Sequence, residues 1–466
     1  MKRLPVAIWA MVIGAFAMGA DEFIVAGVVR EIAVALDVTI GTVGHLESVY
    51  ALGVAIGAPL FTALGTRFGR RSMLLATTGV FLLGNLLSAL APTYEAIMAG
   101  RVVSAMAHGA FLGIAAVFAA EMVDPARKGR AVAVVFSGLT ASTVLGAPIG
   151  AAVGQAFGWR FTFWTLVIFG GVALLGLIAA LPRTAARVQP EPNHDPAHGH
   201  AHSESESHSD GDSAEHSVPA HDPAGGAEFE GLDAHALAHL GGGGQGPTMR
   251  EQAATLARPA VWGALLTTLL AYGGVFTSYV YLAPQLTDVT EFDEVWITPL
   301  LLLFGAGLFV GNHLGGKFAD RNLRTAVLVS LGTLAAVLFA MTSAINNQPA
   351  TVIMMFVFGA AAFAVVAPLQ LRVMAAAGHA PDVASAANIS AFTLGSAIGI
   401  YLGGAAIDAG LALASVNWIG GSITTAGLVV ALLTYRRPTE AEHAHPAAHD
   451  HGSTDQAAHL HPTEHR

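Results

Sequence analysis

The chain is 466 residues long, and 54% of its residues are hydrophobic while only 12% carry a charge. Soluble domains carry about 25% charged residues, so this composition excludes an ordinary soluble protein and favours a polytopic membrane protein. The 53 glycines agree with that class, and the absence of cysteine excludes disulfides and thiolate metal sites.

Twelve apolar segments are long enough, at roughly 20 residues, to cross a bilayer as helices. The predicted spans cover residues 6–29, 39–64, 72–91, 95–120, 131–154, 161–181, 259–283, 295–316, 324–343, 350–373, 383–406 and 412–435. The first run is too long for the apolar core of a signal peptide, so we expect it to be retained as a span.

A polar, histidine-rich segment separates the sixth span from the seventh. It has almost no large apolar residue to bury, so residues 183–257 are expected to form a disordered linker and residues 438–466 a similar tail. The predicted domains are therefore a six-helix bundle at 1–182 and a second one at 258–437.

The distribution of positive charge predicts how the chain is oriented in the membrane. Nearly all of the 22 Lys and Arg residues lie at the termini or in segments on the same side as the termini; the exceptions are Arg30, Arg101 and Arg160. Because cytoplasmic segments hold the excess of Lys and Arg, we expect a multi-pass protein of the inner (plasma) membrane with both termini and the linker in the cytoplasm.

The two groups of spans resemble copies of each other. Gly53, Gly57, Arg67 and Arg70 recur 254 positions later as Gly307, Gly311, Arg321 and Arg324. The predicted fold class is therefore an all-α membrane protein with twelve transmembrane helices in two pseudo-symmetric six-helix bundles, an architecture typical of transporters.

Small residues also recur at every fourth position. The rows are Gly138, Ser142, Gly146, Gly150 and Gly154 in span five, and Ala387, Ala391, Gly395, Gly399 and Gly403 in span eleven. Such a row lets a neighbouring backbone approach closely. It fits static packing, but its matched occurrence on spans two, five, eight and eleven favours a moving interface between the halves.

Several motifs resemble a known family. They are GADEFIVAGVVREIA at 19–33, GRVVSAMAHGAFLG at 100–113, LGAPIGAAVGQAFGWRFTFW at 145–164, GNHLGGKFADR at 311–321 and ASAANISAFTLGSAIGIYLGG at 384–404. With them the chain resembles the major facilitator superfamily, drug:proton antiporter-1 type, and within it the bacterial arabinose-efflux-like and chloramphenicol-resistance-like permeases. The resemblance implies a secondary transporter that exports its substrate.

The resemblance also assigns residues to a conformational motif. They are Arg67, Gly69, Arg70 and Arg71 after span two, Gly146, Pro148 and Gly150 in span five, and Asp320 and Arg321 after span eight. Thr66 stands where the family usually has an aspartate, so the first-half motif lacks a charged contact that the second half keeps. Arg30 stands where this branch usually has proline.

Four charged residues lie inside predicted spans, where a charge is costly and marks a candidate functional site. Asp21, Glu22, Glu47 and Arg101 fall at similar depths, roughly 18–24 Å from the cytoplasmic end at about 1.5 Å per residue. They are the candidate proton-coupling residues, and the resemblance supports Glu22 and Arg101 by position. The alternatives are a static Glu22–Arg101 ion pair and a Glu47 near the outer headgroups.

The candidate substrate cavity rests on aromatic residues of span seven. Tyr272, Phe276 and Tyr279 share one helix face, and His108 of span four joins them as a candidate. An aromatic wall suits flat apolar drugs or sugar rings. The alternatives are helix packing for the aromatic residues and a hydrogen bond to a neighbouring helix for His108.

Nine of the 20 histidines lie in the linker and seven in the tail. His198, His200 and His202 alternate with other residues, so weak binding of zinc, nickel or copper is expected from them. Three interpretations remain open: a soluble linker without a metal role, a cytoplasmic metal or pH sensor, and a collecting arm for a metal exporter.

The function expected from the sequence is proton-coupled efflux of small organic molecules, drugs or sugars, by alternating access. The expected partners are the lipid bilayer, the small-molecule substrate and protons, with no nucleic acid and a monomeric chain. No cofactor is expected, because the proton gradient supplies the energy, and no enzymatic nucleophile–base set stands out. The alternatives are a divalent metal exporter and a membrane sensor that does not transport.

Overall fold

A computed structural model describes residues 5–65, 68–124, 127–181, 254–378 and 381–435, without the side chains of residues 58–65, 381 and 382. Within these ranges every regular element is a helix. The described helices include twelve stretches long and apolar enough to cross a membrane, as the sequence predicts. The histidine triplet at His198, His200 and His202, the linker from 183 to 253, the tail and Arg67 lie outside the described residues.

In the described part of the first half there are seven α-helices and, after the first of them, a short 3-10 helix. They are α1 (Val6–Ile24), η1 (Val25–Gly27), α2 (Val29–Leu36), α3 (Ile40–Gly65), α4 (Arg70–Leu90), α5 (Tyr94–Glu121), α6 (Lys128–Phe157) and α7 (Arg160–Ala180).

The second half follows the same plan. Its elements are α10 (Pro259–Tyr279), α11 (Leu282–Asp288), η3 (Glu294–Trp296), α12 (Ile297–Arg321), α13 (Leu323–Ala344), α14 (Gln348–Ala364), α15 (Val366–Ala377), α16 (Pro381–Asp408) and α17 (Ser415–Tyr435). A helical turn at 254–256 precedes α10, and Leu256 packs against the core of this half.

Local sequence signals explain several helix ends. The side chains of Thr93, Asn322 and Asn347 accept hydrogen bonds from backbone N–H groups in the first turns of α5, α13 and α14. Such caps satisfy donors that have no partner within the helix. After α6, Gly158 adopts a φ of 90°, which a residue with a side chain rarely adopts, and this turn starts α7.

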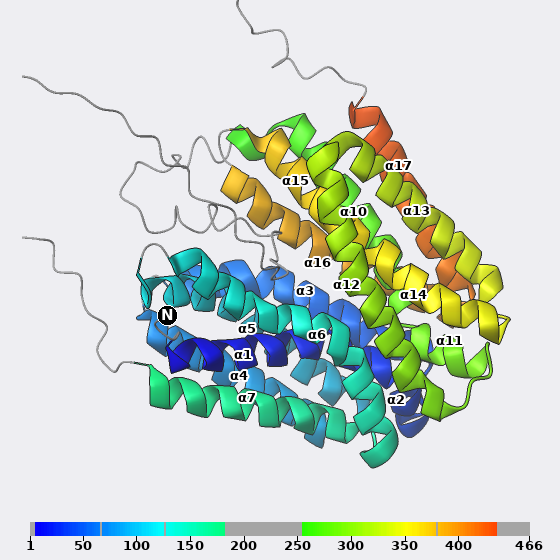
Figure 1. Cartoon of the computed structure of the whole chain (residues 1–466). Coiled ribbons are helices and arrows are strands. Elements are labelled where there is room, and N and C mark those ends of the chain that lie inside the picture. The colour runs from blue at the N-terminus through cyan, green and yellow to red at the C-terminus, as the bar shows by residue number, and fades with distance from the viewer. Residues whose placement is uncertain (1–4, 66–67, 125–126, 182–253, 379–380, 436–466) are drawn as a thin grey trace, which may run out of the picture.

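Three predicted spans are interrupted rather than continuous. The first span ends at α1, and the chain then bends through η1 into α2. In the seventh span, α10 ends at Tyr279 and α11 begins at Leu282. The tenth span divides at Val365 into α14 and α15. The matching bends after α1 and α10 place α2 and α11 side by side at one end of the molecule (Figure 1).

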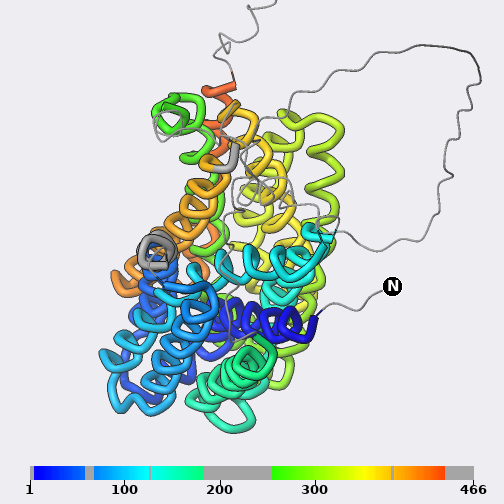
Figure 2. The backbone as a smooth tube through the Cα atoms, turned by 90° about the vertical axis from the view of Figure 1, so that its left-hand side faces the viewer, coloured from blue at the N-terminus to red at the C-terminus, as the bar shows by residue number. Residues whose placement is uncertain are grey.

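Helix pairings repeat between the halves. In the first half α1 packs on α6, α3 on α5, and α4 on α7; in the second half α10 packs on α16, α12 on α14, and α13 on α17. Each half therefore buries its apolar residues in the same arrangement, which agrees with the duplication predicted from the sequence. Figure 2, turned by 90°, shows the first-half helices mainly below and the second-half helices above.

The small-residue rows lie inside the halves, so the prediction that they form the moving interface is wrong. Gly138, Gly146 and Gly150 of α6 meet the backbone or side chains of α1. Gly395 and Gly399 of α16 likewise meet the backbone of α10. The rows of α3 and α12 face α5 and α14, again within one half. Spacing of four residues identifies a helix face, but it does not identify the helix that packs on it.

The halves meet mainly at the end of the molecule that contains Arg30, α2 and α11. There α3 packs on α16, and α6 packs on α12. Gly41 lies against Asp408, and the hydroxyl of Ser48 donates a 2.5 Å hydrogen bond to the carbonyl of Ala397. Toward the opposite end, where α4 begins at Arg70, the helices of the two halves diverge (Figure 1). We call these the Arg30 end and the Arg70 end.

Candidate functional site

A cavity of about 230 Å³ lies between the two halves. Its walls come from α1 and α6 of the first half and from α10, α14 and α16 of the second. The lining residues are Glu22, Phe23, Leu139, Thr140, Thr143, Tyr272, Phe276, Phe363, Ile389, Phe392, Thr393 and Ser396. Because both halves contribute, a relative movement of the halves changes the shape of this cavity.

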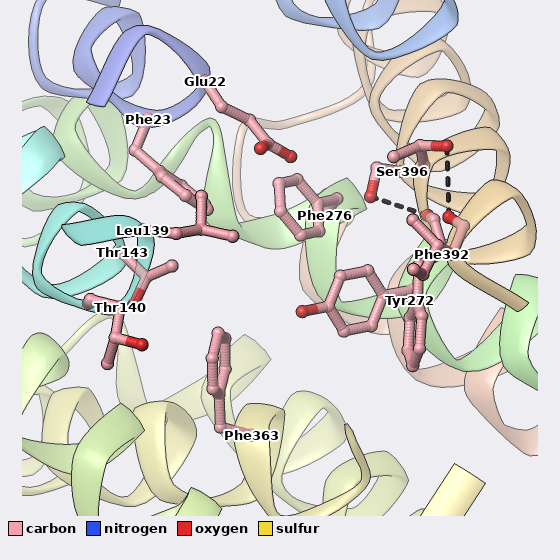
Figure 3. Close-up of a pocket in the computed structure, with 12 residues that line it drawn as sticks. Glu22, Phe23, Leu139, Thr140, Thr143, Tyr272, Phe276, Phe363, Phe392 and Ser396 are labelled. Carbon is pink, nitrogen blue, oxygen red and sulfur yellow. Dashed lines mark hydrogen bonds between the residues drawn. The ribbon is translucent and has the colours of Figure 1, made fainter. Parts of the chain in front are cut away.

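One carboxylate and several aromatic rings define the chemistry of the cavity. Glu22 is half-buried and is the one carboxylate among the lining residues, and its side chain points into the cavity toward Phe276 (Figure 3). Tyr272 stacks edge-on against Phe392, with ring centroids 4.5 Å apart, and lies 5.3 Å from Phe276. The cavity therefore offers flat apolar faces beside one carboxyl group.

Two of the four predicted cavity residues do not line it. Tyr272 and Phe276 do, whereas Tyr279 is buried behind them and stacks on Phe304 with a 5.3 Å centroid distance. His108 is also buried, and its Nδ1 lies 3.0 Å from the hydroxyl of Tyr50. Tyr279 shares the helix face of Phe276, but the neighbouring α12 covers it, which spacing along α10 does not reveal.

Sequence reasoning missed the contribution of α16. Ile389, Phe392, Thr393 and Ser396 line the cavity, and their spacing of three and four residues places them on one helix face. This face lies beside the small-residue row of the same helix. A mixed aromatic and hydroxyl face next to a glycine row that packs on α10 was the signal that could have found it.

Arg101 is the centre of a buried ion cluster next to the cavity. Its Nη1 donates to Asp21 Oδ1 at 2.5 Å and to the Asp21 carbonyl at 2.8 Å, and its Nη2 donates to Glu47 Oε2 at 2.8 Å. The side chains of Arg101 and Asp21 are fully buried, and that of Glu47 is 2% exposed. Arg101 therefore pairs with Asp21 and Glu47, while Glu22 turns to the cavity.

Neutral residues complete the surroundings of the cluster. Asn85 of α4 donates to Asp21 Oδ2 at 3.1 Å, and the guanidinium carbon of Arg101 lies 3.9 Å above the ring of Tyr50. The ring stabilises the cation and shields it from solvent. Four helices, α1, α3, α4 and α5, thus hold these groups in one place.

The residues of the predicted conformational motif fall into separate environments. Arg70 forms an ion pair with Glu121 of α5, and Gly69 precedes α4. The Nε atom of Arg71 is buried without a hydrogen-bond partner among the described residues. Asp320 and Arg321 are exposed at the end of α12.

The span-five part of the motif has a packing role. Gly146 and Gly150 lie against Ala20, Phe23 and Ile24 of α1, and Pro148 is buried inside α6. Within the described ranges, no group of three or more histidine, aspartate or glutamate side chains is arranged to hold a metal ion.

Comparison with known proteins agrees with this architecture. Residues 11–400 match the family model of the Major Facilitator Superfamily. The chain belongs to the major facilitator superfamily. The inner membrane transport protein YdhP of Escherichia coli K12 is 35% identical over 431 residues, which cover 92% of this chain and 96% of YdhP.

Two other relatives also match most of the chain. A chloramphenicol resistance protein of Streptomyces lividans is 30% identical over 429 residues, 92% of this chain and 96% of its own length. The protein AraJ of Escherichia coli K12 is 28% identical over 414 residues, 88% of this chain and 90% of AraJ. The family identifies this chain as a multi-pass membrane transporter rather than an enzyme, in agreement with the resemblance in its motifs.

Proposed function

We propose that this transporter exports small organic molecules in exchange for protons, with the proton gradient as its energy source and no cofactor. The observation that carries the proposal is the cavity between the halves, with the Glu22 carboxylate in its wall. The distribution of Lys and Arg supports a cytoplasmic Arg70 end, with both termini in the cytoplasm of a plasma membrane. The conformation described here then faces the cytoplasm.

The packing of the halves supports alternating access. The contacts between α3 and α16 close the Arg30 end, so a substrate enters the cavity from the Arg70 end. Rocking of the halves would break these contacts and open the cavity on the other side. A relative named for chloramphenicol resistance supports an organic substrate and the outward direction.

The lining of the cavity favours a particular chemistry. Stacking on Tyr272, Phe276 and Phe392 suits a planar ring, and the Glu22 carboxylate suits a positive charge on that ring system. We therefore expect planar aromatic cations to be better substrates than neutral rings of the same size. The hydroxyls of Thr140, Thr143 and Ser396 supply hydrogen bonds for polar substituents.

Transport into proteoliposomes tests the proposal. Vesicles with an acidic lumen should accumulate ethidium, a planar cation, and a protonophore should abolish the accumulation. Glu22→Gln should lower ethidium uptake more than chloramphenicol uptake, since only the cation needs the carboxylate. Glu95→Gln removes an exposed carboxylate at the Arg30 end and serves as the matched control. Accumulation that is indifferent to the pH gradient would overturn proton coupling.

A further inference from the structure

The buried cluster around Arg101 is unbalanced in charge. It contains one guanidinium and two carboxylates, and all three side chains are at most 2% exposed. If every group were ionised, the cluster would carry one net negative charge inside the membrane-spanning part of the protein. Burying an uncompensated charge there costs several kcal/mol or more, so buried groups commonly bind or release a proton instead.

The hydrogen bonds distinguish the two carboxylates. Both carboxylate oxygens of Asp21 accept hydrogen bonds, because Arg101 donates to Oδ1 and Asn85 donates to Oδ2. Glu47 receives a donor only at Oε2, and its Oε1 is buried without a hydrogen-bond partner among the described residues. An ionised carboxylate is less stable when one of its buried oxygens accepts no hydrogen bond. The proton that neutralises the cluster therefore belongs on Oε1 of Glu47.

The groups that face Glu47 offer no second counter-charge. The titratable side chains around it are Asp21 and Glu22 of α1, Tyr50 of α3, Arg101 of α5 and Tyr279 of α10, and His108 of α5 lies against Tyr50. Arg101 is the one permanent cation among them, and it is already shared with Asp21. A proton on Glu47 would make the cluster neutral.

Glu47 also lies where the halves separate. Two residues before it in α3, His45 stacks on Tyr401 of α16 at 5.0 Å, and the next residue, Ser48, donates to the carbonyl of Ala397. These contacts seal Glu47 from the Arg30 end. Their loss when that end opens would give water a path to the carboxyl group, whereas Glu22 stays on the cavity wall.

We propose that Glu47 holds a transported proton on Oε1 in the conformation closed at the Arg30 end, that Asp21 and Arg101 form a permanent ion pair, and that Glu22 serves the substrate. The proton binds when the Arg30 end is open. A cationic substrate at Glu22, one residue along α1 from Asp21, would repel that proton, which then passes to water on the Arg70 side. This assignment rests on the proposed proton coupling.

Infrared spectroscopy of the purified protein in a detergent without ester or carboxyl groups tests the assignment without transport. At neutral pH the wild-type protein should show the carbonyl band of a protonated carboxylic acid. Glu47→Gln should remove it, while Glu22→Gln and the exposed Glu95→Gln should keep it. Glutamine preserves the shape of the side chain and the oxygen that accepts from Arg101, so we expect the variant to fold.

The outcomes separate this inference from the proposed function. A band that survives in Glu47→Gln, or that disappears only in Glu22→Gln or Asp21→Asn, would overturn the assignment. If Glu47→Gln alone removes the band, but the wild-type protein shows no proton-driven transport, the proposed function would be overturned and the protonation of Glu47 would stand. If Glu47→Gln does not fold, Glu47→Asp should shift the band, and an unshifted band would count against Glu47.

Discussion

Arg30 of α2 and Asp288 of α11 form an ion pair, with 2.9 Å between Nε and Oδ1, that joins the two halves at the Arg30 end. The Nη1 atom of Arg30 also lies 3.3 Å from Glu294 of η3. The side chains of Arg30 and Asp288 are 42% and 34% exposed, so each pair is worth only about 0.2–1 kcal/mol. Contacts of that size do not fold a protein, but they do shift a balance between two conformations.

We predict that Arg30→Gln shifts the protein toward the conformation open at the Arg30 end. Losing two pairs of about 0.2–1 kcal/mol corresponds to roughly a two- to thirtyfold change in the equilibrium. The chain has no cysteine, so a single cysteine at Ala397, which is buried against α3, reports the opening by its labelling rate.

High salt should reproduce part of this effect in the wild-type protein, because it screens exposed ion pairs. The matched control is Arg160→Gln at the same end, since Arg160 donates to the Ala91 carbonyl within one half. Equal labelling rates in Arg30→Gln and wild type would contradict a role for these pairs in closing the Arg30 end.

Glu31, next to Arg30, should make stability depend on pH. Burial raises the pKa of Glu31, and the nearby Glu294 raises it further. The folded protein therefore binds a proton at Glu31 more tightly than the unfolded chain does. Protonation of Glu31 stabilises the fold fully below about pH 4.3, and this stabilisation is lost as the pH rises through the pKa of Glu31 in the folded protein. Glu31→Gln should raise the melting temperature near pH 7 and leave it unchanged near pH 4.

Melting curves of the purified protein between pH 4 and pH 8 check this sign. Glu291→Gln, at an exposed position between α11 and η3, provides the comparison and should keep the wild-type pH dependence. A Glu31→Gln variant that is less stable than wild type at neutral pH would show that the carboxylate makes a favourable contact that outweighs its burial.

Two glycine substitutions should have different effects. A side chain at Gly150 would collide with the backbone of Ile24 in the same half, so Gly150→Ala should lower the melting temperature in either conformation, at a cost of about 1–3 kcal/mol. A side chain at Gly41 would collide with Gly404 and Asp408 of the other half. Because separation of the halves relieves that collision, Gly41→Ala should speed labelling at Ala397 with little loss of stability.

Removing one ring should weaken binding without unfolding the protein. Phe392→Ala takes away a ring that lines the cavity beside Tyr272, and stacking of a substrate ring on one aromatic side chain is worth about 0.5–1.5 kcal/mol. We expect the KM for a planar aromatic substrate to rise roughly two- to tenfold. Phe309→Ala removes an exposed ring of α12 and should leave KM unchanged, so an equal effect of both substitutions would argue against stacking in the cavity.

Apolar run lengths predicted the twelve spans, and motif spacing predicted the repeat, because both depend on distances along the chain. The rotation of each helix about its axis depends on its neighbours instead. Asp21 and Glu22 differ by about 100° around α1, so the packing of α1 against α5 decides which one meets Arg101. The sequence identified both residues as candidates, and the family resemblance favoured Glu22 beside Arg101, whereas the structure pairs Arg101 with Asp21.

The bends in α1, α10 and α14 also escaped prediction. The chain there remains apolar, so hydropathy continues through the break at Val365 and through η1. The bends after α1 and α10 bring Arg30 and Asp288 together. Arg30 stood out in the sequence as an unusual residue after the first span, but its pairing with Asp288 depends on the fold.

The placement of the glycine rows inside each half has a consequence for the evolution of this protein. Residues that hold a half together, such as Gly150 and Gly399, are different from those that join the halves, such as Arg30, Ser48 and Asp408. Mutations in the second set can change how firmly the two halves are held together while the packing inside each half is preserved. Substitutions at the Arg30 end can therefore accumulate during evolution without disturbing the packing inside either half.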